Sequence, residues 1–160
     1  MDHVDRILDE WRRERPDLDA SPIGIIGRLH RLAAELTEQL VEVYREHGLG
    51  EGEFDVLAAL RRAGDPFERA PGDLADHTMV TSGAMTKRID RLEAAGLVTR
   101  RPSAVDGRGR VVALTPHGRE TIDRAIEAHI ANEHRLVGML DPADRAALEP
   151  ILTAWLRALQ

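Results

Sequence analysis

Cysteine is absent from this chain of 160 residues, and aromatic side chains make up only 3% of it. Without cysteine the protein has no disulfides, no thiol-based redox sensor and no cysteine-ligated metal. No apolar run approaches the roughly 18–20 residues that a membrane-spanning helix needs. The charged, periodic N-terminal segment is also unlike a secretory leader. We therefore expect a protein of the cytoplasm that does not associate with membranes.

Catalytic motifs are missing as well. The chain has no glycine-rich phosphate loop, no G-x-S-x-G elbow and no HExxH arrangement among its seven histidines. We therefore predict no enzyme activity, no catalytic residue, no cofactor and no metal.

The net charge of −6 is not that of a typical nucleic-acid binder, but the charge is unevenly distributed along the chain. Residues 81–110 carry seven basic and three acidic groups, whereas the rest of the chain carries 15 basic and 25 acidic groups. A local excess of positive charge is typical of a surface that contacts phosphates. A solvated arginine-rich face would give the same count, so charge alone leaves both interpretations open.

Hydrophobic periodicity and turn residues predict a mainly α-helical chain with a small β-hairpin wing. Segment 64–72, GDPFERAPG, is predicted to be a loop, and Pro150 is expected to kink or loosen the last helix. The expected helices are residues 2–15, 23–47, 51–63, 71–77, 81–95, 115–140 and 141–159, and the expected strands are 97–101 and 110–114.

The order helix, turn, helix, hairpin is that of a winged helix-turn-helix, which we place in residues 51–115. Segments 1–50 and 116–160 are helical and more apolar than a monomer of this size requires. Together they are predicted to form a dimerisation region, and residues 1–50 are also expected to contribute to a ligand pocket.

Three motifs in this order resemble the MarR family of transcription factors. They are LEAAGL at residues 92–97, the Asp-x-Arg of a wing at 106–108, and LTPHG at 114–118. The resemblance covers about residues 30–140. It implies a recognition helix, a wing and a dimeric repressor of a pseudo-palindromic operator on double-stranded DNA. A dimer of this kind places its two recognition helices about 34 Å apart, so its half-sites lie about 10 bp apart.

Candidate DNA contacts come from both parts of this unit. Hydroxyls at a helix N-terminus can hold a phosphate, and exposed polar groups of the recognition helix can reach base edges. In the wing an arginine is expected to enter the minor groove while an aspartate orients it. The candidates are Thr81, Ser82, Thr86, Lys87 and Arg91 in the helix, and Arg101, Asp106, Arg108 and Arg110 in the wing.

Two arginines occupy positions where an apolar residue is expected. Arg88 borders the buried stripe of the recognition helix, and a partly buried guanidinium needs a carboxylate or an anion. Asp55, in the helix expected to pack behind it, is the candidate partner. Arg15 continues the apolar stripe of the first helix and shares a face with Trp11.

Trp11, Arg15, Asp55 and Arg88 resemble a set found in the urate-responsive branch of the MarR family, which adds an N-terminal helix. The resemblance implies that a small planar anion such as urate binds them and releases DNA. Related regulators answer trans-aconitate or phenolic acids, and the sequence does not separate these effectors. An alternative is that they are a core tryptophan, a surface arginine and a structural ion pair, but the four matching positions and the extra helix favour a ligand site.

Two further alternatives stay open. A metal sensor would need His30, His47, Asp55 and His77 to converge, and an architectural DNA binder would have no effector.

Overall fold

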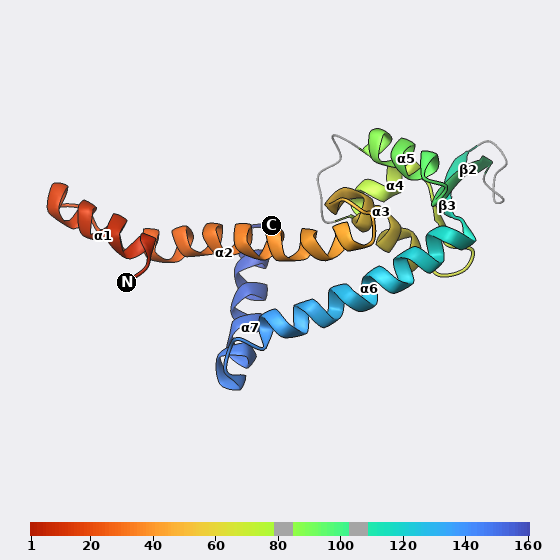
Figure 1. Cartoon of the computed structure of the whole chain (residues 1–160). Helices are drawn as coiled ribbons and strands as arrows, with labels where there is room; N and C mark the ends of the chain where they lie inside the picture. Colours follow the sequence, from red (N-terminus) through yellow and green to blue (C-terminus); the bar gives the residue numbers. More distant parts are fainter. Residues whose placement is uncertain (79–84, 103–108) are drawn as a thin grey trace. The chain divides into compact units, whose positions relative to one another are not determined.

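The computed structural model describes residues 1–78, 85–102 and 109–160 (Figure 1). The chain divides into two compact units, Met1–Gln39 and Leu40–Gln160. Helix α2, Ser21–Glu46, begins in the first unit and ends in the second. No helix in the described ranges has the length and apolarity needed to cross a membrane.

The first unit is a helical hairpin in which α1, His3–Glu14, packs against the start of α2. Val4 and Leu8 are the buried residues of α1. They lie against Gly24 and Gly27, where a Cβ atom would come within 3.5 Å of their side chains. The two glycines therefore allow the helices to approach closely, as small residues do at helix contacts.

An ion-pair cluster closes this hairpin at its polar edge. Asp2 caps α1 in a capping box with Asp5, and Arg28 of α2 binds both carboxylates, with 2.8 Å from its Nε to Asp2. The hydrogen bond from Arg28 is the largest cause of a lowered pKa at Asp2, which falls to about 2.

The second unit is built around α3, Glu51–Arg62, with α4, Pro71–Asp76, and α5, Met85–Ala94. Every residue of α3 from Phe54 to Leu60 is buried, so this helix forms the centre of the core. Gly96, with a φ of +70°, lies just beyond the end of α5 at the position the sequence predicts.

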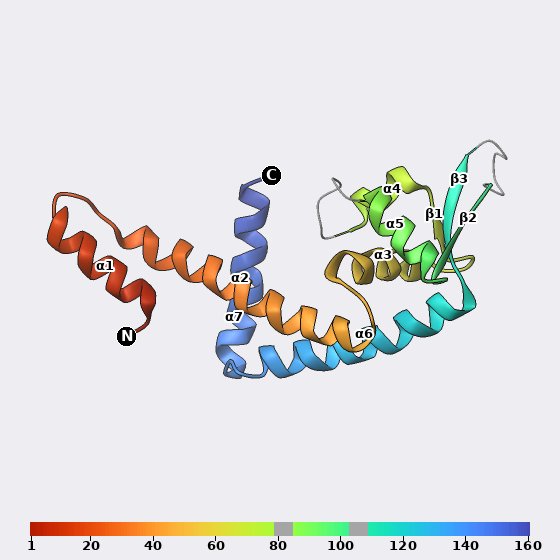
Figure 2. The same ribbon diagram turned by 45° about the horizontal axis from the view of Figure 1, so that its top comes forward.

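Three antiparallel strands form a small sheet in the order β1-β3-β2 (Figure 2). They are β1, Glu68–Arg69, β2, Val98–Pro102, and β3, Arg110–Leu114. The prediction of a loop over 64–72 is wrong at β1, which pairs with Val112 and Ala113 of β3. Two residues are too few to show the alternation of a strand, so periodicity did not detect it.

Helix α6, Pro116–Val137, follows β3 directly. Thr115 caps it by accepting a hydrogen bond from the Gly118 N–H at 2.9 Å. A Cβ atom at Gly118 would lie 1.8 Å from the backbone oxygen of Leu97. The glycine of the LTPHG motif therefore permits direct backbone packing between α6 and the segment after α5.

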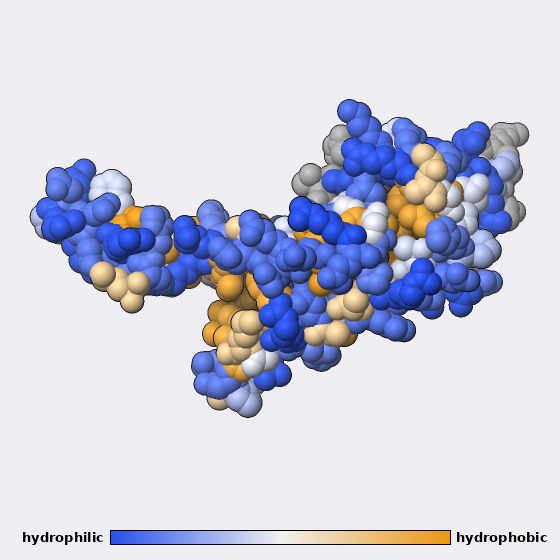
Figure 3. Space-filling model, in the orientation of Figure 1, coloured by the Kyte–Doolittle hydropathy of each residue, from blue (hydrophilic) through white to orange (hydrophobic). Residues whose placement is uncertain are grey.

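Helix α7, Pro142–Ala158, has Asp141 as its cap and continues through Pro150. None of its residues is buried, and apolar side chains gather along it (Figure 3). Those more than half exposed near its C-terminal end are Ile151, Leu156 and Leu159.

Candidate nucleic-acid interface and effector site

Helix α5 has one buried and one exposed face, as the sequence predicts. Met85, Ile89 and Leu92 are buried, while Thr86 and Lys87 are exposed. Because Leu74 of α4 belongs to the same core, α4 packs behind α5 and leaves the polar face accessible. Thr86 and Lys87 are therefore accessible to a binding partner as large as a DNA duplex.

Arg91 lies on the same helix but has a partner within the protein. Its Nη1 atom is 2.8 Å from the carboxylate of Glu53 on α3. The Arg91 side chain is still 68% exposed, so the ion pair compensates its charge and leaves it at the surface. This contact ties α5 to α3, in addition to the base contact that the sequence predicts.

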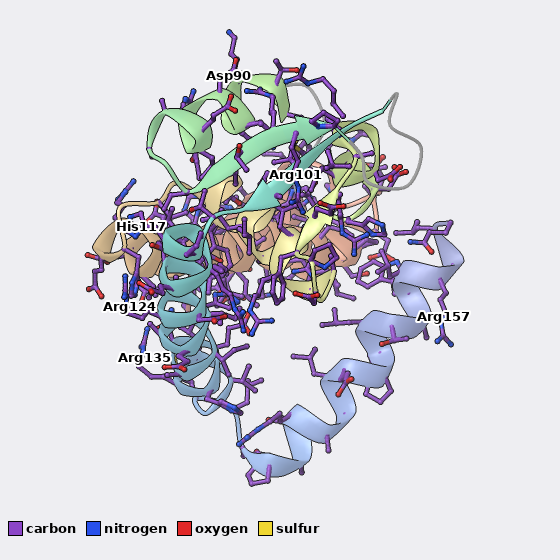
Figure 4. All side chains as sticks on the ribbon, turned by 90° about the vertical axis from the view of Figure 1, so that its right-hand side faces the viewer. Asp90, Arg101, His117, Arg124, Arg135 and Arg157 are labelled. Carbon is purple, nitrogen blue, oxygen red and sulfur yellow. The ribbon has the colours of Figure 1, made fainter. Side chains whose placement is uncertain are left out.

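The wing strand β2 carries two adjacent arginines that point to opposite faces. Arg101 donates from its Nε to Glu68 of β1 at 2.9 Å and is about half exposed. Arg100 instead binds Asp90 and Glu93 of α5. The hydrogen bond to Asp90 is the largest cause of a raised pKa at Arg100. In Figure 4 the labelled Asp90 identifies α5 and the labelled Arg101 identifies β2.

Arg100 is not among the residues predicted from the sequence, although the sequence contains a signal for its contact. Arg100 shares strand parity with buried Val98, so its side chain faces the helix. Asp90 and Glu93 are three residues apart on that helix and therefore share a side. Reading the strand and the helix together would have predicted the contact.

Arg110 is exposed at the start of β3, opposite Pro102 in the ladder. The remaining predicted contacts in this region, Thr81, Ser82, Asp106 and Arg108, lie outside the described residues. Their roles stay predictions.

Arg88 lies directly over the first turn of α3. A Cβ atom at Gly52 would be 2.2 Å from its Nε and 2.7 Å from its Cζ. Gly52 and Asp55 are one helical turn apart and therefore face the same way. Asp55 is itself buried, with 7% of its surface exposed. The structure thus brings Arg88 to the helix face that carries Asp55.

Trp11 and Arg15 belong to the first unit, whereas Asp55 and Arg88 belong to the second. Trp11 is 42% exposed, which argues against a core tryptophan within its own unit. The guanidinium of Arg15 donates two hydrogen bonds to Asp17, at 2.8 and 2.6 Å. A pocket that combines all four residues stays a prediction.

An aromatic cluster lies beside Asp55. Tyr44 stacks on Phe54 with ring centroids 4.0 Å apart, and its hydroxyl is 3.2 Å from Nδ1 of His129 on α6. Burial raises the pKa of Tyr44 to about 12, and the negative charges of Glu133, Glu51 and Asp55 add to the effect. The cluster fixes α3 against α2 and α6 at the position of Asp55.

A metal centre finds no support in the described residues. No three histidine, aspartate or glutamate side chains among them form a group able to hold a metal ion.

Comparison with known proteins identifies relatives over nearly the whole chain. A model of the MarR family matches residues 47–109. The HTH-type transcriptional regulator PecS of Dickeya dadantii is 36% identical over 93% of this chain and 90% of its own. The structure of AbsC, a MarR family transcriptional regulator from Streptomyces coelicolor, superimposes with a TM-score of 0.74 at 28% identity, covering 89% of this chain and 96% of AbsC.

A third relative is Bordetella bronchiseptica BpsR, whose DNA binding is regulated by 6-hydroxynicotinic acid. Its TM-score is 0.68 at 26% identity, over 81% of this chain and 91% of BpsR. These similarities confirm the predicted fold class, a mainly helical winged helix-turn-helix.

Proposed function

Because this chain belongs to the MarR family of transcriptional regulators, we propose that it is a ligand-responsive repressor. As a homodimer it binds a pseudo-palindromic operator, and a small planar anion such as urate releases it. The position of Arg88 carries this proposal, because that side chain lies on the helix expected to enter the major groove and reaches back to α3.

The exposed polar face of α5 supports the DNA-binding part. Thr86 and Lys87 extend from it, and Arg110 adds an exposed cation on the wing, opposite Pro102 in the ladder. In a dimer two such faces would meet successive major grooves about 34 Å apart.

The exposed apolar residues support the homodimer. Ile151 and Leu156 of α7 and Leu159 just after it are 58–76% exposed, and Ile25 of α2 is 60% exposed. An accumulation of apolar surface on elements outside the core is typical of a subunit interface.

The effector site rests on charge and position. Arg88 is a cation on the recognition helix, and buried Asp55 lies on the helix face that it approaches. A planar anion at Arg88 would compete with a carboxylate there and be repelled by Asp55, so α5 would move. The ligand must bind the released state better than the DNA-bound state by the free energy of that movement. Trp11 and Arg15 would complete the pocket by stacking on the ring and neutralising its charge.

The effector is tested first by thermal unfolding with urate, xanthine, trans-aconitate and salicylate. At one hundred times its dissociation constant, a true effector raises the melting temperature by roughly 5–10 °C. A rise with salicylate or trans-aconitate alone would replace urate with that class. No rise with any of the four would refute the effector and leave a DNA binder without one.

Release is tested by fluorescence anisotropy on DNA from upstream of the gene. We expect the effector to weaken binding by the wild-type protein and to have little effect on Arg88→Ala. Arg13→Ala, which removes an exposed arginine of α1, is the control and should respond as the wild type does. A normal response of Arg88→Ala would exclude the mechanism.

A further inference from the structure

Arg100 joins the wing to the recognition helix by contacts with two carboxylates. Its guanidinium binds Asp90 and Glu93, and its backbone N–H donates to Glu93 at 3.2 Å. The side chain is only 23% exposed, less than those of Arg91 at 68% and Arg101 at 48%. Arg100 is therefore directed at the helix and partly shielded from a DNA backbone.

The chemistry of the side chain suits this contact. A guanidinium presents five donors in a rigid plane and can hold two carboxylates at once, whereas a lysine ammonium acts as a single point charge. Asp90 and Glu93 are one turn apart on α5, and without a shared cation between them they would repel each other.

The contact also reaches the rest of the wing. Arg100 pairs with Val112 in the ladder between β2 and β3, so the hairpin moves with it. On the opposite face of the sheet, Arg101 of β2 is tied to Glu68 of β1. Both faces of the wing are therefore held by ion pairs, and the Arg100 contact is the one that leads to α5.

We propose that Arg100 is a positioning residue that holds the wing and the recognition helix at one spacing, so that both engage DNA together. It acts through Asp90 and Glu93 and does not contact phosphate. This inference rests on the proposed DNA binding by α5.

The test compares the salt dependence of DNA affinity in variants that each lose one cation. Removing a phosphate contact lowers the slope of log affinity against log salt by about one per protomer. We expect this for Lys87→Gln, because an ammonium inside the major groove also neutralises the charge of the phosphates that border it. Arg100→Gln should instead weaken binding by about two- to thirtyfold at every salt concentration with its slope unchanged. Equal losses of slope in the two variants would overturn the proposal.

For a second variant, the positioning role and simple electrostatics predict opposite changes in DNA affinity. Asp90→Asn combined with Glu93→Gln removes two negative charges near DNA, so charge alone predicts tighter binding. If the carboxylates are the other half of the brace, binding weakens although Arg100 is intact. Tighter binding by this variant would refute the positioning role.

Thermal unfolding checks that each variant is folded. If Arg100→Gln is unfolded, Arg100→Lys replaces it in the comparison of salt dependence. Lysine keeps the charge but reaches one carboxylate, so it should weaken binding without changing the slope. Full wild-type affinity of Arg100→Lys would also count against the proposal. Failure of the wild-type protein to bind any DNA would refute the proposed function instead, so the two failures are distinguishable.

Discussion

Alanine at position 52 would displace Arg88 without changing its charge. The new Cβ atom would lie 2.2 Å from Nε and 2.7 Å from Cδ and Cζ of Arg88, where ordinary contacts begin at 3.4 Å. Because Gly52 is fixed in a buried helix, the arginine must retreat by about 1 Å or more. The guanidinium of Arg88 therefore loses its position over α3 but keeps its charge and its hydrogen-bond donors.

The stability of the protein should hardly change. Alanine is favoured over glycine in a helix by about 0.5–1 kcal/mol, and the displaced arginine contacts offset part of this gain. We expect the melting temperature to stay within about 4 °C of the wild type. Affinity for the operator should fall about two- to thirtyfold, and the response to effector should be blunted.

Gly72→Ala provides a matched control. Gly72 is the second residue of α4, as Gly52 is of α3, and a Cβ atom there would meet nothing within 4 Å. Both variants are compared by anisotropy on the same DNA, with and without effector. If Gly52→Ala behaves as Gly72→Ala does, the location of Arg88 over α3 has no role in signalling.

Three further changes test the fold. Gly118→Ala places a Cβ atom 1.8 Å from the Leu97 backbone oxygen, so we expect a loss of about 1–3 kcal/mol in calorimetry, and unchanged stability would contradict the packing. The pKa of Tyr44, the only tyrosine, is raised to about 12, so its phenolate absorbance should titrate near 12, and stability should fall as the pH rises from 10 to 12. The pKa of Asp2 is lowered to about 2 by Arg28, so protection of α1 amides from hydrogen exchange should fall between pH 4 and pH 2, and an unaffected helix would exclude the cluster.

The helices were predictable because each has a periodic stripe and terminal signals. Thr115 and Asp141 begin α6 and α7 as caps, and Gly96 follows α5 with a positive φ. The predicted end of the α6 segment at 140 extends beyond its observed end at Val137. Pairings that depend on residues far apart in sequence have no such local signal, which is why β1 was missed.

In the candidate site, too, local features were predictable from the sequence and long-range contacts were not. The orientation of Thr86 and Lys87 follows from periodicity within one helix and is confirmed. The position of Arg88 depends on Gly52, 36 residues earlier, whose missing side chain leaves the space that the arginine fills. A sequence pattern shows that an arginine interrupts an apolar stripe, but it does not show which helix the arginine side chain packs against.

Ion pairs also change the meaning of the local charge. The excess in residues 81–110 counts Arg91 and Arg101 as free cations, yet Glu53 and Glu68, which hold them, lie outside that segment. Their carboxylates reduce the field without removing the arginines from the surface. Among the described residues of this segment, Lys87 on α5 and Arg110 on β3 are the exposed cations for which no ion pair is found, so phosphates in the proposed complex would meet them first. The paired arginines instead fix the elements from which these two extend, Arg91 on α5 and Arg101 in the sheet.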